Sequence, residues 1–141
     1  MFSRSEEGNI IVYKISSEIS SVDSVIEHCK EDLSRFNVIS DSTEFKVIVR
    51  ELLNNAVKHG NHEIAEKTVT CNIEYLGARR FKIVVEDQGS GFNYRNINMD
   101  LPENTDRIKR KGYALISSFS ERIEFNEKGN SVTAYITIHR D

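Results

Sequence analysis

The chain has 141 residues, of which 38% are hydrophobic and 29% charged, so it can bury one sizeable core. We expect a single domain over residues 1–141. The formal net charge of -3 gives no reason to expect nucleic acid or an anionic membrane as a partner. No apolar stretch approaches the roughly 20 residues of a membrane span, and the start MFSRSEEGN lacks a signal-peptide core, which favours a cytoplasmic protein.

The cysteines and histidines indicate neither redox nor zinc chemistry. Cys29 lies in an apolar helical pattern and Cys71 in a strand pattern, so we expect buried free thiols rather than a disulfide. The four histidines are scattered without the ligand spacing of a zinc site: His28, His59, His62 and His139.

The first part of the chain predicts a strand followed by two helices. Residues 9–15 (NIIVYKI) are β-branched and apolar, which is typical of a strand. A helix start at Ser20 is followed by apolar residues at helical spacing: Val22, Val25, Ile26, Cys29 and Leu33. Asp41 and Glu44 resemble a capping box, after which Phe45, Ile48, Val49, Leu52, Leu53 and Ala56 share one helical face. This second helix is expected to run to about His59 and to end at Gly60.

The rest of the chain predicts two hairpins separated by a lid and a helix. Residues 69–75 and 81–85 alternate between apolar and polar side chains, as in a hairpin with one buried face. Residues 88–111 form a long polar stretch, typical of a lid, and a helical pattern follows from Gly112. RIEFN and SVTAYITI flank the turn EKGN, a strong hairpin signal. This order predicts an α+β fold with a mixed, mostly antiparallel sheet and helices on one face.

The segment ELLNNAVKHGN, residues 51–61, carries the first candidate site. Glu51, Asn55 and His59 are spaced four apart and form one stripe of the second helix, and Lys58 lies near the same edge. An amide oxygen is a suitable ligand for Mg²⁺, and a carboxylate one turn away could take a proton from a hydroxyl group. A lysine could neutralise phosphate charge. An ordinary solvated helix edge has the same spacing, so the spacing alone decides nothing.

The segment VEDQGSGFN, residues 85–93, carries the second candidate site. Asp87 follows an apolar strand directly, and its carboxylate could accept a hydrogen bond from an exocyclic amine such as that of adenine. Gly89 and Gly91 permit positive φ and close approach of a ligand, and Phe92 could pack against a base. A strand followed by a glycine-rich turn is the alternative. Neither G-x-x-x-x-G-K-[ST] nor a G-x-G-x-x-G between a strand and a helix is present.

The two segments, about 30 residues apart and followed by a polar lid and a glycine at a helix start, together resemble the GHKL ATP-binding superfamily. The resemblance implies the Bergerat fold, a two-layer α/β sandwich, and the cofactors ATP and Mg²⁺. It places Glu51 and Asn55 in the N box, with Asn55 on Mg²⁺ and with Lys58 and His59 near the nucleotide. It places Asp87, Gly89 and Gly91 in the adenine-binding box, with Asp87 on the adenine amino group. Thr133, on the last strand, matches a position that often supports this aspartate.

The third box of the superfamily is altered in this chain. The usual G-x-G-[LI] is replaced by Gly112, Tyr113, Ala114 and Leu115. Backbone amides at a helix N-terminus there could still bind phosphate, but the methyl group of Ala114 would crowd the γ-phosphate. Lys111, the last residue of a cationic run with Arg107, Lys109 and Arg110, either reaches the phosphates or belongs to a solvated charged segment.

Within the superfamily the chain looks like the bacterial anti-sigma-factor serine/threonine kinases. That resemblance implies that Glu51 is the general base on a serine or threonine hydroxyl of a STAS-domain anti-anti-sigma partner. It also implies a possible sigma-factor partner and a homodimer. Two alternatives stay open: a non-catalytic ATP-binding switch module, favoured by Ala114, and a detached histidine-kinase-like catalytic domain. A histidine kinase would need a phosphoacceptor helix pair, and these 141 residues contain no such region.

Overall fold

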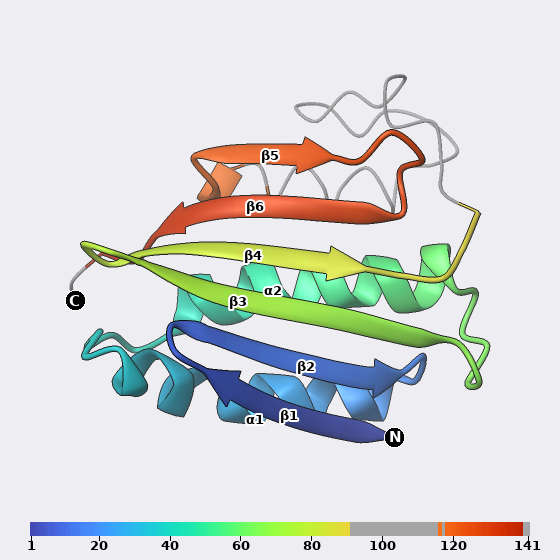
Figure 1. Ribbon diagram of the computed structural model, residues 1–141, viewed down its shortest axis with the longest axis horizontal. Coiled ribbons are helices and arrows are strands. Elements are labelled where there is room, and N and C mark those ends of the chain that lie inside the picture. Colours follow the sequence, from blue (N-terminus) through green and yellow to red (C-terminus); the bar gives the residue numbers. More distant parts are fainter. Residues whose placement is uncertain (91–115, 117, 140–141) are drawn as a thin grey trace.

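The computed structural model describes residues 1–90, 116 and 118–139, which build one sheet and two long helices (Figure 1). The elements, in chain order, are β1 (Phe2–Glu7), β2 (Ile10–Ser16), α1 (Ile19–Arg35), α2 (Thr43–Asn55), the π-helical turn η1 (Ala56–Gly60), β3 (Thr68–Gly77), β4 (Arg80–Glu86), β5 (Arg122–Phe125) and β6 (Ser131–Thr137).

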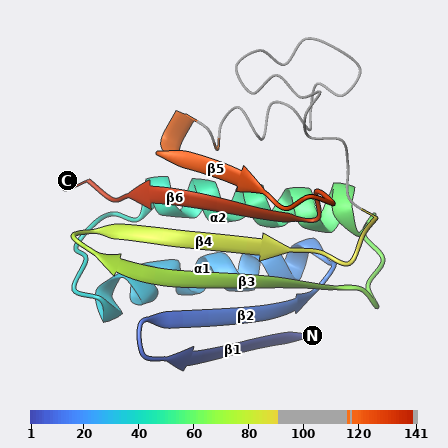
Figure 2. The same ribbon diagram turned by 45° about the horizontal axis from the view of Figure 1, so that its top comes forward.

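The strands form a sheet of order β1-β2-β3-β4-β6-β5 in which every described pairing is antiparallel. Helices α1 and α2 lie side by side on one face of this sheet, as both views show (Figure 1, Figure 2). The predicted α+β architecture of two layers, a sheet and a layer of helices, is therefore confirmed. No helix within the described ranges is long and apolar enough to cross a bilayer.

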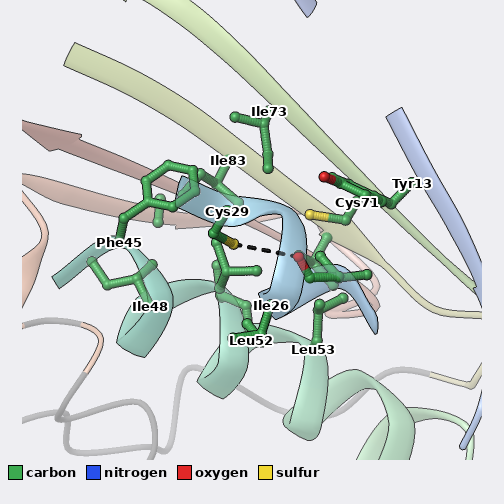
Figure 3. Packing of buried hydrophobic residues seen from close by; sticks show 14 of the residues in the cluster. Tyr13, Ile26, Cys29, Phe45, Ile48, Leu52, Leu53, Cys71, Ile73 and Ile83 are labelled. Carbon is green, nitrogen blue, oxygen red and sulfur yellow. Dashed lines mark hydrogen bonds between the residues drawn. The ribbon is translucent and has the colours of Figure 1, made fainter. Parts of the chain in front are cut away.

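The core lies between the sheet and the helices. The central strands send alternate side chains to the helical layer, as Phe81, Ile83 and Val85 of β4 do, because side chains of a strand point alternately to its two faces. Figure 3 shows side chains of β2, β3 and β4 meeting those of both helices. Cys29 and Cys71 belong to this cluster and are buried free thiols, as predicted.

The sequence did not predict strand β1. Its residues are mostly polar and exposed, so it shows no pattern of alternating burial. The strand exists because it pairs with the buried strand β2, and its charges protect an open sheet edge from pairing with other chains. Arg4 of β1 also reaches Asp32 of α1 at 2.7 Å, and the Tyr13 hydroxyl donates to the same buried carboxylate.

The predicted helix boundaries agree with the structure, with two local differences. Helix α2 begins at Thr43 after the N-cap Ser42, so the capping box predicted from Asp41 and Glu44 is not formed, and the Thr43 N–H donates to the Asp41 carboxylate at 2.9 Å instead. The helix ends at Gly60 as expected, but its last five residues widen from α to π geometry. Both predicted hairpins are present as β3–β4 and β5–β6, whereas the start of the helix predicted from Gly112 lies outside the described residues.

Candidate functional site

The described part of the candidate site lies where the end of α2 meets the end of β4. Both views place the end of α2, where it continues into η1, next to the turn that follows β4 (Figure 1, Figure 2). Glu51 and Asn55 come from the last turns of α2, where Asn55 is buried and Glu51 is half-buried. The spacing of four residues puts these side chains about 5–6 Å apart at their Cβ atoms on one side of the helix.

The π turn sets how the helix approaches β4. The N–H of Asn61 donates to the carbonyl of Ala56 at 2.8 Å, an i to i−5 bond in place of the usual i to i−4. Such single π turns occur often at functional sites because they shift the following residues around the helix axis. Here Lys58 is exposed, His59 is half-buried, and Gly60 faces the turn after β4.

Gly60 lies against the carboxylate of Asp87. A Cβ atom on Gly60 would stand 2.1 Å from Asp87 Oδ2 and 2.3 Å from its Cγ, so only glycine leaves room for this carboxylate. The other oxygen, Oδ1, accepts a hydrogen bond from the Gly89 N–H at 2.8 Å. Asp87 therefore has a defined orientation between the helix end and its own turn.

Gly89 is needed for a different reason from the one the sequence predicted. The structure gives it no positive φ, unlike Gly8, Gly77 and Gly129. A Cβ at Gly89 would instead stand 2.1 Å from the Gly60 carbonyl oxygen. The close approach is thus made by the protein's own backbone, and it locks the turn after β4 onto the end of η1.

The last hairpin supports Asp87 through Asn130 rather than Thr133. The Asp87 N–H donates to the Asn130 carbonyl at 2.9 Å, and Asn130 Nδ2 donates to the Asp87 carbonyl at 3.0 Å. Thr133 lies opposite Val84, between the buried Val132 and Ala134, so it belongs to the sheet face away from the helices. Asp87 continues the alternation of Phe81, Ile83 and Val85, whose side chains point to the opposite face, toward the helices. The structure therefore does not bring Thr133 to Asp87, and the predicted contact is corrected on this point.

Asn55 is a described side chain whose buried amide could hold a divalent cation. Its Nδ2 atom is buried and has no hydrogen-bond partner among the residues that the structure describes. Because amide oxygen and nitrogen positions are assigned rather than observed, the same site can present Oδ1. A buried polar atom without a partner fits a missing ligand. Among the described residues there is no cluster of three or more His, Cys, Asp or Glu side chains that could hold a metal ion.

Sequence reasoning overlooked two residues and named several that the structure does not describe. Gly60 was interpreted only as a helix end, and Asn61 was not singled out, although both stand in the string KHGN. Seven predicted residues lie outside the described ranges: Gly91, Phe92, Lys111, Gly112, Tyr113, Ala114 and Leu115.

Comparison with known proteins identifies the family. The family model of the histidine kinase-like ATPase domain matches residues 15–136. The chain belongs to this family. This histidine kinase-like ATPase domain is thus an ATP-binding, kinase-like member of the GHKL superfamily, as its motifs predicted. The match includes all seven predicted site residues that the structure describes, among them Glu51, Asn55 and Asp87.

One solved structure similar to this domain is the histidine kinase domain from the blue-light activated histidine kinase of Erythrobacter litoralis. It shares 15% sequence identity, with a TM-score of 0.49. The alignment covers 84% of this chain and 59% of that chain, so the domain spans less than two thirds of the length of that structure. No curated protein matches the sequence.

Proposed function

We propose that this domain is an ATP- and Mg²⁺-dependent serine/threonine protein kinase of the anti-sigma type. Its substrate would be a STAS-domain anti-anti-sigma protein, and a sigma factor would be a second partner. The observation that carries the proposal is the position of Glu51: it stands one helical turn before the buried Asn55, on the helix whose end packs against Asp87. By the resemblance of the sequence we also propose a cytoplasmic homodimer.

The positions of three side chains support the roles in nucleotide binding that we propose for them. Asp87 is fixed by Gly60 and Gly89 and would accept a hydrogen bond from the adenine amino group. Asn55 would hold Mg²⁺, which would supply positive charge to offset the negative charge of the phosphates. Lys58 is exposed within the same turn region and can approach phosphate from solvent.

Glu51 would act on the protein substrate. Its carboxylate accepts the proton of the serine or threonine hydroxyl, and the hydroxyl oxygen forms a bond to the γ-phosphorus of ATP. The bond between that phosphorus and the β,γ-bridging oxygen breaks, and ADP leaves with the electron pair. Positioning and charge neutralisation supply most of the rate enhancement in such transfers.

The test is phosphate transfer from labelled ATP to a STAS-domain protein. Glu51→Gln keeps the size of the side chain and should bind ATP like wild type while losing most of the transfer, because general-base catalysis contributes about 10²- to 10⁴-fold. Glu44→Gln is a matched control two turns earlier on the same helix and should transfer normally. Equal transfer by Glu51→Gln and wild type would refute the general-base role.

Two other outcomes separate the alternatives. Nucleotide-dependent partner binding without transfer would identify a switch module. An acid-labile phosphorylated product would identify transfer to histidine, because phosphoserine and phosphothreonine survive acid.

A further inference from the structure

We infer that Asn61 is the positioning residue that gives the site its selectivity for adenine. The inference rests on the proposed function, in which Asp87 binds the adenine amino group. Asn61 would not contact the nucleotide. It would act through the backbone of residues 87–89, which it ties to the end of the N-box helix.

Asn61 is fully buried, and its side chain makes three hydrogen bonds. Its Oδ1 atom accepts from the Gln88 N–H at 2.8 Å. Its Nδ2 atom donates to the Ser17 hydroxyl at 2.8 Å and to the Thr68 carbonyl at 3.0 Å. One neutral side chain therefore joins the end of η1, the β2–α1 connection, the start of β3 and the residue after Asp87.

The hydrogen bonds of Asn61 close into a ring. Asn61 Nδ2 donates to the Thr68 carbonyl, the Thr68 N–H donates to Gln88 Oε1 at 2.7 Å, and the Gln88 N–H returns to Asn61 Oδ1. A ring in which each member both donates and accepts has little freedom to shift. Gln88 is thereby held at a fixed position relative to the helix end.

This ring acts on Asp87 because it includes Gln88, the residue after Asp87, and Asn61, the residue after Gly60. Gly60, which precedes Asn61, packs on the Asp87 carboxylate, and Gln88 follows Asp87 directly. On the other side, Asn130 bonds both the N–H and the carbonyl of Asp87. Asn130 thus fixes the backbone of Asp87. Asn61 fixes the distance between the turn after β4 and the end of η1, and this distance sets the surroundings of the Asp87 carboxylate.

The test compares the dissociation constants of ATP and of purine riboside triphosphate, which lacks only the amino group that Asp87 would bind. Wild type should favour ATP by about tenfold or more, as for loss of a hydrogen bond to a charged group. In Asn61→Ala this ratio should fall to within about twofold of one, because the turn that carries Asp87 is no longer tied to the end of η1. A general loss of stability would weaken both nucleotides alike and leave the ratio unchanged.

Two further variants complete the design. Asn9→Ala is the matched control, because Asn9 donates to the Tyr75 carbonyl at 2.9 Å near the other end of β3, and its ratio should equal that of wild type. Gln88→Ala breaks the ring from an exposed side chain, so it tests the inference even where Asn61→Ala does not fold. It should lower the ratio in the same direction but by less.

The outcomes distinguish this inference from the proposed function. If wild type, Gln88→Ala and folded Asn61→Ala all keep their preference for ATP over purine riboside triphosphate, the role of Asn61 is overturned. The kinase proposal is then left intact. A wild type that binds neither nucleotide overturns both. A selective wild type whose selectivity is lost in Asn61→Ala and kept in Asn9→Ala supports the inference.

Discussion

Replacing Gly60 by alanine should disable nucleotide binding without changing any group that contacts the nucleotide. The new Cβ would stand 2.1 Å from Asp87 Oδ2, whereas ordinary contact begins at 3.4 Å. The difference, 3.4 minus 2.1, means that the carboxylate must retreat by about 1.3 Å. A displacement of that size would break the hydrogen bond that we propose between Asp87 and the adenine amino group. Hydrogen bonds to charged groups are worth about 1.5–3 kcal/mol, so the dissociation constant of ATP should rise about 10- to 150-fold.

Titration calorimetry with ATP and Mg²⁺ measures this effect directly, and thermal unfolding shows whether the variant is folded. Gly77→Ala is the control. Gly77 has a φ of +86° and no atom within 4 Å of its Cβ position, so alanine there strains the backbone without a clash. It should lose about 1–2 kcal/mol of stability but bind ATP like wild type. An unchanged ATP affinity in folded Gly60→Ala would show that ATP binding does not depend on the space that Gly60 leaves for the Asp87 carboxylate.

A double-mutant cycle with Asp87→Ala isolates the contact itself. In the wild-type background, crowding at Gly60 should cost about 1–3 kcal/mol of the free energy of unfolding. Once Asp87 is alanine the clash is gone, and Gly60→Ala should become neutral or stabilising by up to about 1 kcal/mol, because alanine restricts the unfolded chain. Additive effects would show that the two residues do not touch.

Three further predictions concern other residues. Asn55→Ala should weaken ATP binding in the presence of Mg²⁺ but not in EDTA; an equal loss in both conditions, measured by calorimetry, would contradict a metal role. Burial raises the pKa of Cys29 to about 12 and also raises the pKa of the Cys71 thiol, so neither should react with a thiol reagent at pH 8 until the protein unfolds, and rapid labelling of the native protein would refute this. The hydrogen bond from the Thr43 N–H lowers the pKa of Asp41 below its ordinary 3.8, so its contribution to stability is present above that pH and lost as the pH falls through the lower folded value. Asp41→Ala should accordingly be less stable than wild type at pH 7, with a difference that shrinks below pH 3.8, and a difference that is constant in denaturant titrations across this range would contradict the assignment.

The sequence predicted most of the described fold because its signals are local. Apolar residues at helical spacing and alternating residues such as Phe81, Ile83 and Val85 reveal which face each element buries. Strand β1 was not predicted because its six residues bury almost nothing and depend on pairing with β2. Pairing is a tertiary property, and residues 2–7 carry no pattern from which it could be inferred.

The site was predicted in part for the same reason. From the sequence, Asn55 could be placed on one stripe of the second helix, and Asp87 could be placed directly after its strand. The contact of Gly60 with Asp87 and the ring around Asn61 join residues 27 apart in the chain, and a local pattern cannot show them. Thr133 is a different case. It stands between the apolar Val132 and Ala134, so the alternation already indicated the face away from Asp87.

All the roles proposed for these residues require ATP to bind where the end of α2 meets the turn after β4. Titration calorimetry of wild type and Asp87→Ala with ATP and Mg²⁺ measures this binding, and circular dichroism shows whether both proteins are folded. Wild type should bind ATP saturably with a one-to-one stoichiometry, and Asp87→Ala should lose most of that affinity. Absence of ATP binding by folded wild type, or equal affinity in the two proteins, would show that the nucleotide site does not lie there.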